Sequence, residues 1–246
     1  MEKVNFRNSR GLNLAGVLHF PKQKTANAII ISHGFIANKD RVRFIKLAKS
    51  LNEMGFVVLR FDFSGCGESD KAPITIKNQV GDLKSAIAYL KKKGFSSISL
   101  IGHSLGGLVS LLVYDNKIKT IVLLAPVTKS QTPYIFRQKK FLKQIMEKGF
   151  LIYKRGKNNF KIPMKYLIER RKVNQKSILS KIKCSVLIVH GTKDDHIPLT
   201  HSKKALKYLP KGSKLEIIKN GDHKLDRKFD EVMEICTNWF KRAAQQ

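Results

Sequence analysis

The stretch SISLIGHSLG, residues 97–106, decides the predicted fold. Its first five residues have the β-branched and apolar character of a buried strand, and a helix-like segment runs from Leu105 to Asn116. Between them lies Gly102-x-Ser104-x-Gly106, a pattern that is weak alone but informative at a strand-to-helix turn. Small residues on both sides of Ser104 let neighbouring backbone pack close, so its hydroxyl is expected to be exposed at a helix N-terminus.

Outward from this turn, short β-branched runs alternate with amphipathic helical segments, which is typical of a mostly parallel sheet covered on both faces. Helices are predicted at Asp40–Met54, Asn78–Lys93 and about Lys224–Arg242 from apolar residues at helical spacing. The sequence therefore predicts an α/β fold with an eight-stranded sheet flanked by helices. The strands are expected at Glu2–Asn8, Leu12–Phe20, Asn27–Ser32, Val57–Phe61, Ser97–Ile101, Thr120–Leu124, Ser185–His190 and Lys214–Ile218.

Residues 128–183 interrupt this alternation, because no strand is expected there. Seven aromatic residues gather in the segment, with seventeen Lys and Arg against only Glu147 and Glu169. A connection of this length between two strands is rarely a bare loop. We predict an inserted, mainly helical cap with helices near Lys139–Lys154 and Pro163–Lys172. It would sit on an α/β core formed by residues 1–127 and 184–246.

The charge of the chain is strongly basic. Its 246 residues include 48 Lys and Arg against 18 Asp and Glu, a formal net charge of +30. Such a charge attracts polyanions, but 37 of the basic residues are lysine, whereas proteins that recognise phosphates and bases favour arginine. We interpret the charge mainly as compositional, which argues against nucleic acid as a partner. Peripheral contact with an anionic membrane and an anionic substrate stay open, and a monomer or homodimer is expected.

The apolar runs and the cysteines of the chain indicate where in the cell the protein is expected and whether its thiols are expected to be reduced. The longest apolar runs fall short of the roughly 18 residues of a membrane span, and the start of the chain has no apolar signal core. A cytoplasmic location is therefore expected. Cys66, Cys184 and Cys236 are far apart, which predicts reduced thiols rather than a disulfide framework. No spaced metal ligands or dinucleotide fingerprint occur, so neither a metal nor another cofactor is expected.

A serine hydroxyl needs a base to become a nucleophile, and the base needs an orienting acid. After a serine turn of this type, the acid and then the histidine follow later strands. Asp194 follows the strand expected at 185–190, and His223 follows the one expected at 214–218. These two residues, with Ser104, are the candidate catalytic triad.

Neighbouring residues are alternatives to these assignments. Asp195 competes with Asp194 as the acid, while Asp222 is interpreted as a turn former. His196 and His201 compete with His223, although a local pair with the acid would not match the strand order. The remaining histidines lie in or beside strands and motifs and are interpreted as structural: His19, His33, His103 and His190.

Two backbone N–H groups are candidates for an oxyanion hole. The Leu105 N–H lies at the expected helix N-terminus. The second donor should come from the turn after the strand at 27–32, where Gly34 lets the Phe35 N–H turn toward Ser104.

Five motifs in order resemble the α/β-hydrolase superfamily, and most closely its serine-aminopeptidase-like branch, which includes monoglyceride lipases and cinnamoyl (feruloyl) esterases. They are His33-Gly34-Phe35, the run FDFSGCGES at 61–69, Gly102-His103-Ser104-Leu105-Gly106, Gly191-x-x-Asp194 and Gly221-Asp222-His223. The resemblance covers about 1–127 and 184–246 and leaves the cap unmatched. The glycines at 65 and 67 look like a phosphate loop, but in this family they form a structural turn.

The resemblance implies a serine hydrolase that forms an acyl-enzyme, with Ser104, His223 and Asp194 as the triad and Phe35 and Leu105 at the oxyanion hole. We expect a carboxylesterase for small to medium apolar acyl or aryl esters. A thioesterase, amidase or aminopeptidase with the same triad, or a basic binding module with secondary hydrolase activity, are alternatives. The cap residues predicted to line the substrate pocket are Phe136, Phe141, Ile145, Met146, Phe150 and Tyr153.

Overall fold

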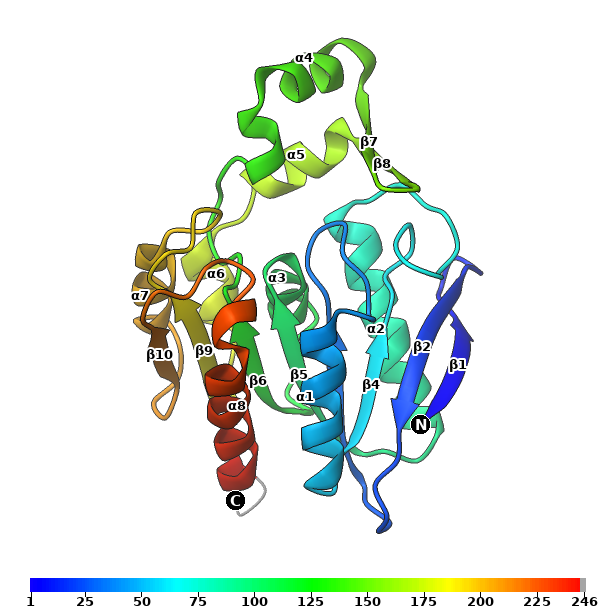
Figure 1. The fold of residues 1–246 in the computed structure, drawn as a ribbon, viewed down its shortest axis with the longest axis vertical. Coiled ribbons are helices and arrows are strands. Elements are labelled where there is room, and N and C mark those ends of the chain that lie inside the picture. Colours follow the sequence, from blue (N-terminus) through cyan, green and yellow to red (C-terminus); the bar gives the residue numbers. More distant parts are fainter. Residues whose placement is uncertain (244–246) are drawn as a thin grey trace.

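An eight-stranded sheet forms the centre of the molecule in the computed structural model, which describes residues 1–243 (Figure 1). The order is β1-β2-β4-β3-β5-β6-β9-β10; β2 is antiparallel to β1 and β4, and the other neighbours are parallel. This confirms the predicted mostly parallel sheet. The strands are β1 (Glu2–Arg7), β2 (Asn13–His19), β3 (Asn27–Ser32), β4 (Val57–Phe61), β5 (Ser97–His103), β6 (Ile118–Leu124), β9 (Val186–Gly191) and β10 (Lys214–Ile218).

Helices cover both faces of the sheet, because alternate residues of each central strand are apolar on both sides. In β3, Ile30 packs in the cluster with α2 (Ile76–Lys92) and α3 (Leu105–Leu112). Ile29 and Ile31 pack in the other cluster, with α1 (Val42–Glu53) and α8 (Phe229–Ala243). Helix α7 (Leu199–Leu206) also belongs to the core and contacts β9 and β10.

A buried ion-pair network holds the loop that follows β3. The Lys39 N–H donates to Asp62 Oδ1 at 2.6 Å, and Lys39 Nζ lies 3.1 Å from Asp62 Oδ2. The same ammonium also pairs with Asp40 and Glu68, while Arg60 donates to the Lys39 carbonyl at 2.6 Å. These bonds tie the turn after β4 to residues 39 and 40, so charged groups hold this end of the loop beside Ser104.

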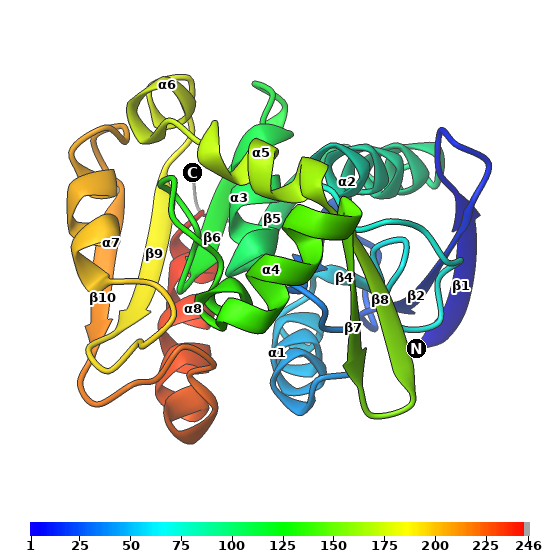
Figure 2. The same cartoon turned by 90° about the horizontal axis from the view of Figure 1, so that it is seen from above.

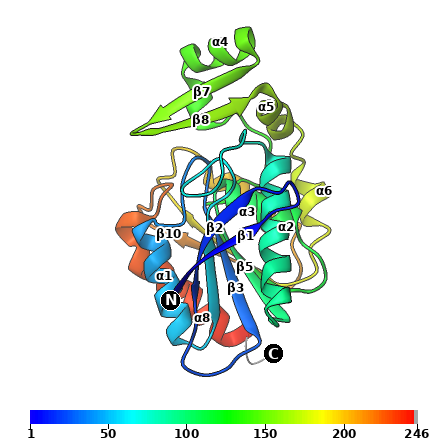
Figure 3. The ribbon, with the colours of Figure 1, turned by 90° about the vertical axis from the view of Figure 1, so that its right-hand side faces the viewer.

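The cap rises above the carboxyl ends of the parallel strands (Figures 2 and 3). Its elements are η1 (Tyr134–Arg137), α4 (Lys139–Lys148), β7 (Phe150–Arg155), β8 (Asn158–Pro163) and α5 (Met164–Arg171). Helix α6 (Gln175–Leu179) follows, and its Leu179 packs with the core. The raised part of the segment therefore ends at α5.

The prediction of a mainly helical cap is wrong between 149 and 163, where β7 and β8 form an antiparallel hairpin. Helix α4 stops six residues before the expected end at 154 because Gly149, at φ 73°, makes a left-handed C-cap whose N–H donates to Ile145. Beyond it the buried residues alternate, with Leu151 opposite Ile162 in the hairpin register. The second predicted helix is confirmed, with Pro163 as the N-cap of α5.

The three cysteines are free thiols, and Cys66 and Cys236 are buried. Among the described residues, no helix combines the length and apolar character that crossing a membrane requires. The cytoplasmic location stays a prediction.

Candidate active site

Ser104 occupies a strained turn between β5 and α3. Its backbone has φ 53° and ψ −114°, a conformation that costs on the order of 1–3 kcal/mol for a residue other than glycine. Close backbone packing explains the two flanking glycines. A Cβ at Gly102 would lie 2.5 Å from the Gly106 carbonyl oxygen, and one at Gly106 would lie 2.4 Å from that of Ser32. The turn thus places Ser104 at the N-terminus of α3, as the sequence predicts. The expected exposure of its hydroxyl is wrong, because Ser104 is 8% exposed beneath the cap and meets solvent only through the cavity that it lines.

The structure brings Ser104, His223 and Asp194 into one hydrogen-bonded chain. The Ser104 hydroxyl donates to His223 Nε2 at 3.0 Å, and His223 Nδ1–H donates to Asp194 Oδ2 at 2.8 Å. The tautomer is assigned from these partners. The three residues follow β5, β9 and β10, so the parallel strands deliver them to one edge of the sheet. This arrangement can remove the serine proton as its oxygen attacks a carbonyl.

The Asp194 side chain is fully buried and held by four donors. Its Oδ1 accepts the N–H groups of His196 at 2.9 Å and Ile197 at 2.7 Å. Its Oδ2 faces His223 and lies 3.1 Å from His190 Nε2. Burial opposes ionisation, but the hydrogen bonds from His190 and His223 outweigh it and hold the pKa of Asp194 well below its usual range. The carboxylate is therefore charged whenever the enzyme is near neutral pH.

The neighbouring residues considered as alternatives to Asp194 and His223 are not part of the hydrogen-bonded chain that reaches Ser104. The Asp195 side chain is 65% exposed, and Asp222 accepts the Leu225 N–H at 2.7 Å as a turn former. His196 stacks between Tyr134 and His223, with ring centroids 4.0 Å and 4.4 Å away. Its ring borders the site without joining the hydrogen-bonded chain.

The remaining histidines support strands and turns. His103 Nε2–H donates to the His223 carbonyl at 3.0 Å, which fixes the loop that carries His223. His33 accepts the Phe63 N–H at 3.1 Å, and His19 accepts from Arg60 at 3.1 Å. His190 accepts the Ser202 hydroxyl at 2.7 Å.

Acidification should destabilise the fold, because burial lowers the pKa of His33, His103, His196 and His201 and lowers that of His19 to about 4. Below pH ~6.5 these histidines bind protons in the unfolded chain but not in the folded protein, so protonation favours unfolding. We expect the free energy of unfolding, measured in urea, to fall as the pH drops from about 6.5 to 4, by at most ~1.4 kcal/mol per pH unit for each histidine. His19→Gln should reduce the dependence of the free energy of unfolding on pH. A free energy of unfolding that stays constant from pH ~6.5 to ~4 would contradict the lowered pKa values of these histidines.

The two predicted oxyanion donors lie beside the nucleophile. Leu105 begins α3, and Gly34 is so near that an added Cβ would lie 3.2 Å from Ser104 Cβ. Neither the Phe35 nor the Leu105 N–H donates to a backbone carbonyl within residues 1–243. A free N–H is what an oxyanion donor requires, and the assignment of these two groups to an oxyanion hole stays a prediction.

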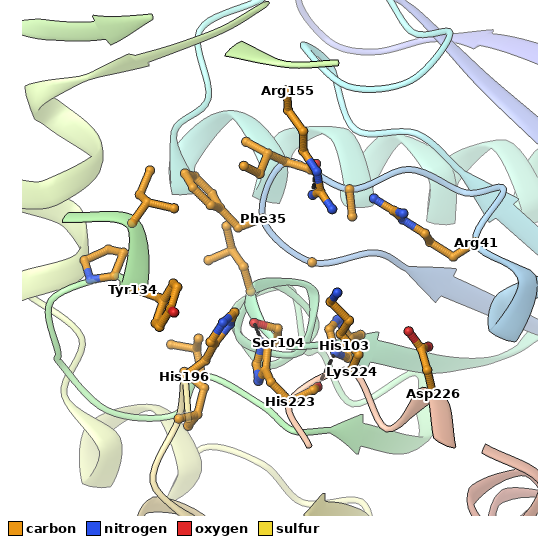
Figure 4. A pocket seen from close by; sticks show the side chains of 18 of the residues that line it. Phe35, Arg41, His103, Ser104, Tyr134, Arg155, His196, His223, Lys224 and Asp226 are labelled. Carbon is orange, nitrogen blue, oxygen red and sulfur yellow. Dashed lines mark hydrogen bonds between the residues drawn. The ribbon is translucent and has the colours of Figure 1, made fainter. Parts of the chain in front are cut away.

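Ser104 opens into a cavity of about 600 Å³ between the core and the cap (Figure 4). One wall belongs to an apolar cluster that contains Phe35, Leu105, Val127, Ile135, Tyr166 and Ile197. The Phe35 ring stacks on Tyr166 with centroids 4.8 Å apart. Another wall is basic and contains Arg41, Arg43, Lys46, Arg155 and Lys224, with Asp226 as the one carboxylate among the described lining residues.

The predicted pocket lining is largely wrong. Of the six cap residues expected there, Tyr153 lines the cavity, whereas Phe136, Phe141, Ile145, Met146 and Phe150 do not. Phe136 and Ile145 are buried in the interior of the cap, since the apolar side of α4 packs on η1 and β7. Met146 is 64% exposed, and Phe150 lies under Lys161.

The sequence analysis missed the residues that replace them. Tyr134 and Ile135 come from η1, Tyr166 and Arg170 from α5, and Arg41 from the loop before α1. Arg170 is 2% exposed, and its Nη1 has no partner within the described residues. The sequence marks Arg41 and Arg170 only as arginines in a chain whose basic residues are mostly lysine. Residue type does not indicate whether a side chain points into a cavity.

No cluster of three or more His, Cys, Asp or Glu side chains in the described part of the chain is arranged to hold a metal ion. The expectation of no cofactor stays a prediction.

The sheet and the strained serine turn after β5 are those of the α/β-hydrolase superfamily. Residues 23–180 match the family described as "Serine aminopeptidase, S33", which is more than half of the chain, and the chain belongs to that family. It is accordingly a serine hydrolase of the α/β-hydrolase superfamily.

Similar proteins in sequence and structure agree with this assignment. The mouse mitochondrial palmitoyl-protein thioesterase ABHD10 is 26% identical over 226 residues, covering 88% of this chain and 75% of that protein. Mouse serine hydrolase BPHL is 26% identical over 239 residues, covering 87% and 79%. Est1E from Butyrivibrio proteoclasticus, solved with ferulic acid bound, superposes with a TM-score of 0.81 at 24% identity, covering 99% of this chain and all of that chain.

Proposed function

We propose that this protein hydrolyses carboxylic esters through an acyl-enzyme. The observation that carries the proposal is the Ser104 hydroxyl, which lies 3.0 Å from His223 Nε2 and borders the cavity. Ser104 Oγ attacks the ester carbonyl carbon while His223 Nε2 takes the hydroxyl proton. Asp194 holds the imidazole in the required tautomer and stabilises the imidazolium.

The tetrahedral intermediate carries its negative charge on the former carbonyl oxygen. The N–H groups of Phe35 and Leu105 donate to that oxygen, each contributing on the order of 3 kcal/mol. His223 then gives its proton to the leaving alcohol, and the ester bond breaks. Water attacks the acyl-enzyme with His223 again as base, which releases the acid and regenerates Ser104.

The walls of the cavity support a substrate with an apolar or aryl part. A volume of about 600 Å³ suits a small to medium ester. Phe35 and Tyr134 bring aromatic rings to the cavity, and the buried ring of Tyr166 stacks on Phe35. The ferulic acid bound to the structurally similar Est1E has the same aryl character.

The cavity gives less support to an aminopeptidase, which would need a free carboxylate for the substrate's amine. Glu169 accepts the Ile76 N–H at 2.6 Å, and Glu147 lies on the surface within 3.7 Å of Lys143. Asp226 is already paired with Arg43 at 2.7 Å. A cationic amine would also meet the basic wall of the cavity.

A thioesterase is the second candidate, because the same atoms cleave a thioester and one relative is named a palmitoyl-protein thioesterase. The two are separated by a series of p-nitrophenyl esters, from acetate to laurate, assayed beside S-acyl thioesters of the same acids. The proposal predicts turnover of the esters with an optimum at short to medium acyl chains. Turnover of thioesters alone would replace it by the second candidate, and turnover of neither by a folded enzyme would refute both.

A further inference from the structure

The basic wall of the cavity is built from three separate parts of the chain. Arg41 comes from the loop before α1 and Arg155 from the end of β7 in the cap, while Lys224 directly follows His223 in the chain. Figure 4 shows the guanidinium groups of Arg41 and Arg155 turned toward each other on one side of Ser104, with Lys224 below them. Tyr134 and His196 lie on the opposite side.

Their positive charges are not balanced within the protein. Asp226 pairs with Arg43 at 2.7 Å, and no ion pair of Arg41, Arg155 or Lys224 occurs within residues 1–243. Arg155 donates to the Ile36 carbonyl at 3.4 Å, a long contact that leaves most of its N–H groups free. Partial burial, together with the charges of Arg155 and Arg43, lowers the pKa of Arg41. The like charges therefore repel one another, and an anion between them would relieve the repulsion.

These side chains differ from the many lysines of the surface. A solvated lysine is screened and costs little. Arg41 is half-buried and Arg155 is exposed, but both line the cavity that also holds the nucleophile. A planar guanidinium donates two parallel hydrogen bonds to a carboxylate or phosphate. The other wall carries no charged side chain and is mainly apolar, so the two walls suit the two ends of an amphipathic molecule.

We infer that the substrate is an ester with an apolar part and an anionic group, a carboxylate or phosphate, and that Arg41 and Arg155 bind the anionic group. This inference rests on the proposed ester hydrolysis and adds the charge of the substrate to it. The apolar part would lie along Phe35, Tyr134 and Tyr166 while the scissile carbonyl sits at Ser104. The anionic group could belong to the acyl part or to the leaving alcohol, and matched substrates distinguish these two sources.

The test compares esters that differ in one charge. For the acyl side, the pair is mono-p-nitrophenyl glutarate and its neutral methyl ester, after subtraction of the spontaneous rates. For the leaving side, it is p-(butyryloxy)phenyl phosphate and p-methoxyphenyl butyrate. In each pair the measured quantity is the ratio of kcat/KM for the anionic ester to that for the neutral ester.

We expect this ratio to exceed one in at least one pair for the wild type and to fall with added salt. Arg41→Gln and Arg155→Gln should each lower the ratio about tenfold, the loss expected for a charge-assisted hydrogen bond. Lys157→Gln is the matched control, because Lys157 is an exposed cation of the same hairpin that does not line the cavity. Its ratio should equal that of the wild type.

The outcomes separate this inference from the proposed function. Hydrolysis of all four esters with ratios that the arginine substitutions leave unchanged would overturn the inference and leave ester hydrolysis intact. An equal loss of ratio in Lys157→Gln would also overturn it, since general surface charge would then be the cause. Absence of turnover of every ester would refute the proposed function and the inference together.

Discussion

Ser104→Ala should lower kcat for p-nitrophenyl butyrate by about 10⁶-fold, the order of magnitude found when the nucleophile of a serine hydrolase is removed. The alanine has no oxygen to form the acyl-enzyme, and the oxyanion donors and substrate binding leave a residual acceleration of only about 10³–10⁴-fold over water. Turnover should fall below detection, and covalent labelling by a fluorophosphonate should disappear with it. The melting temperature checks that the variant is folded.

Ser110→Ala is the matched control for this substitution. Ser110 is also a buried serine of α3, but its hydroxyl donates to the Gly106 carbonyl at 2.8 Å and faces no histidine. Its removal should leave kcat within a few-fold of the wild-type value. Wild-type turnover by pure Ser104→Ala protein would mean that another group is the nucleophile.

Asp194→Asn should lower kcat by about 10⁴-fold, the loss known for the same change in a Ser-His-Asp triad. Asp194 Oδ1 accepts two backbone N–H groups, so the amide oxygen of asparagine will take that position. The amide NH₂ then faces His223 Nδ1 and favours the tautomer with its hydrogen on Nε2. A histidine in that tautomer cannot accept the Ser104 proton.

The adjacent residue supplies the control, because Asp195→Asn removes the same charge one position away from a largely exposed side chain. Its kcat should stay within about twofold of the wild type. Both variants are assayed on one ester across a range of pH, with melting temperatures measured in parallel. A larger loss in Asp195→Asn than in Asp194→Asn would exchange the roles of the two carboxylates.

The sheet, and the edge of it at which the candidate residues meet, can be predicted from the amino-acid sequence alone. β-Branched runs define the eight strands, and in a parallel sheet the residues after successive strands must gather at one edge. For this reason the positions of Ser104, Asp194 and His223 follow from strand order alone. The turn at Ser104 is equally local, since glycine at 102 and 106 is required by backbone contacts within a few residues and with β3.

The structure of the cap and the residues that line the cavity depend on tertiary packing and could not be predicted from the sequence. The apolar stripe of α4 was visible in the sequence, but periodicity does not say what a stripe faces, and it packs into the cap's own interior. Gly149 ends α4 and starts a hairpin that carries Arg155 to the cavity. Arg41 meets it from a loop more than a hundred residues earlier in the chain, held in place by the Lys39–Asp62 pair. The approach of Arg41 and Arg155 depends on how the cap packs on the core. The local sequence around an exposed basic residue does not indicate where its side chain points.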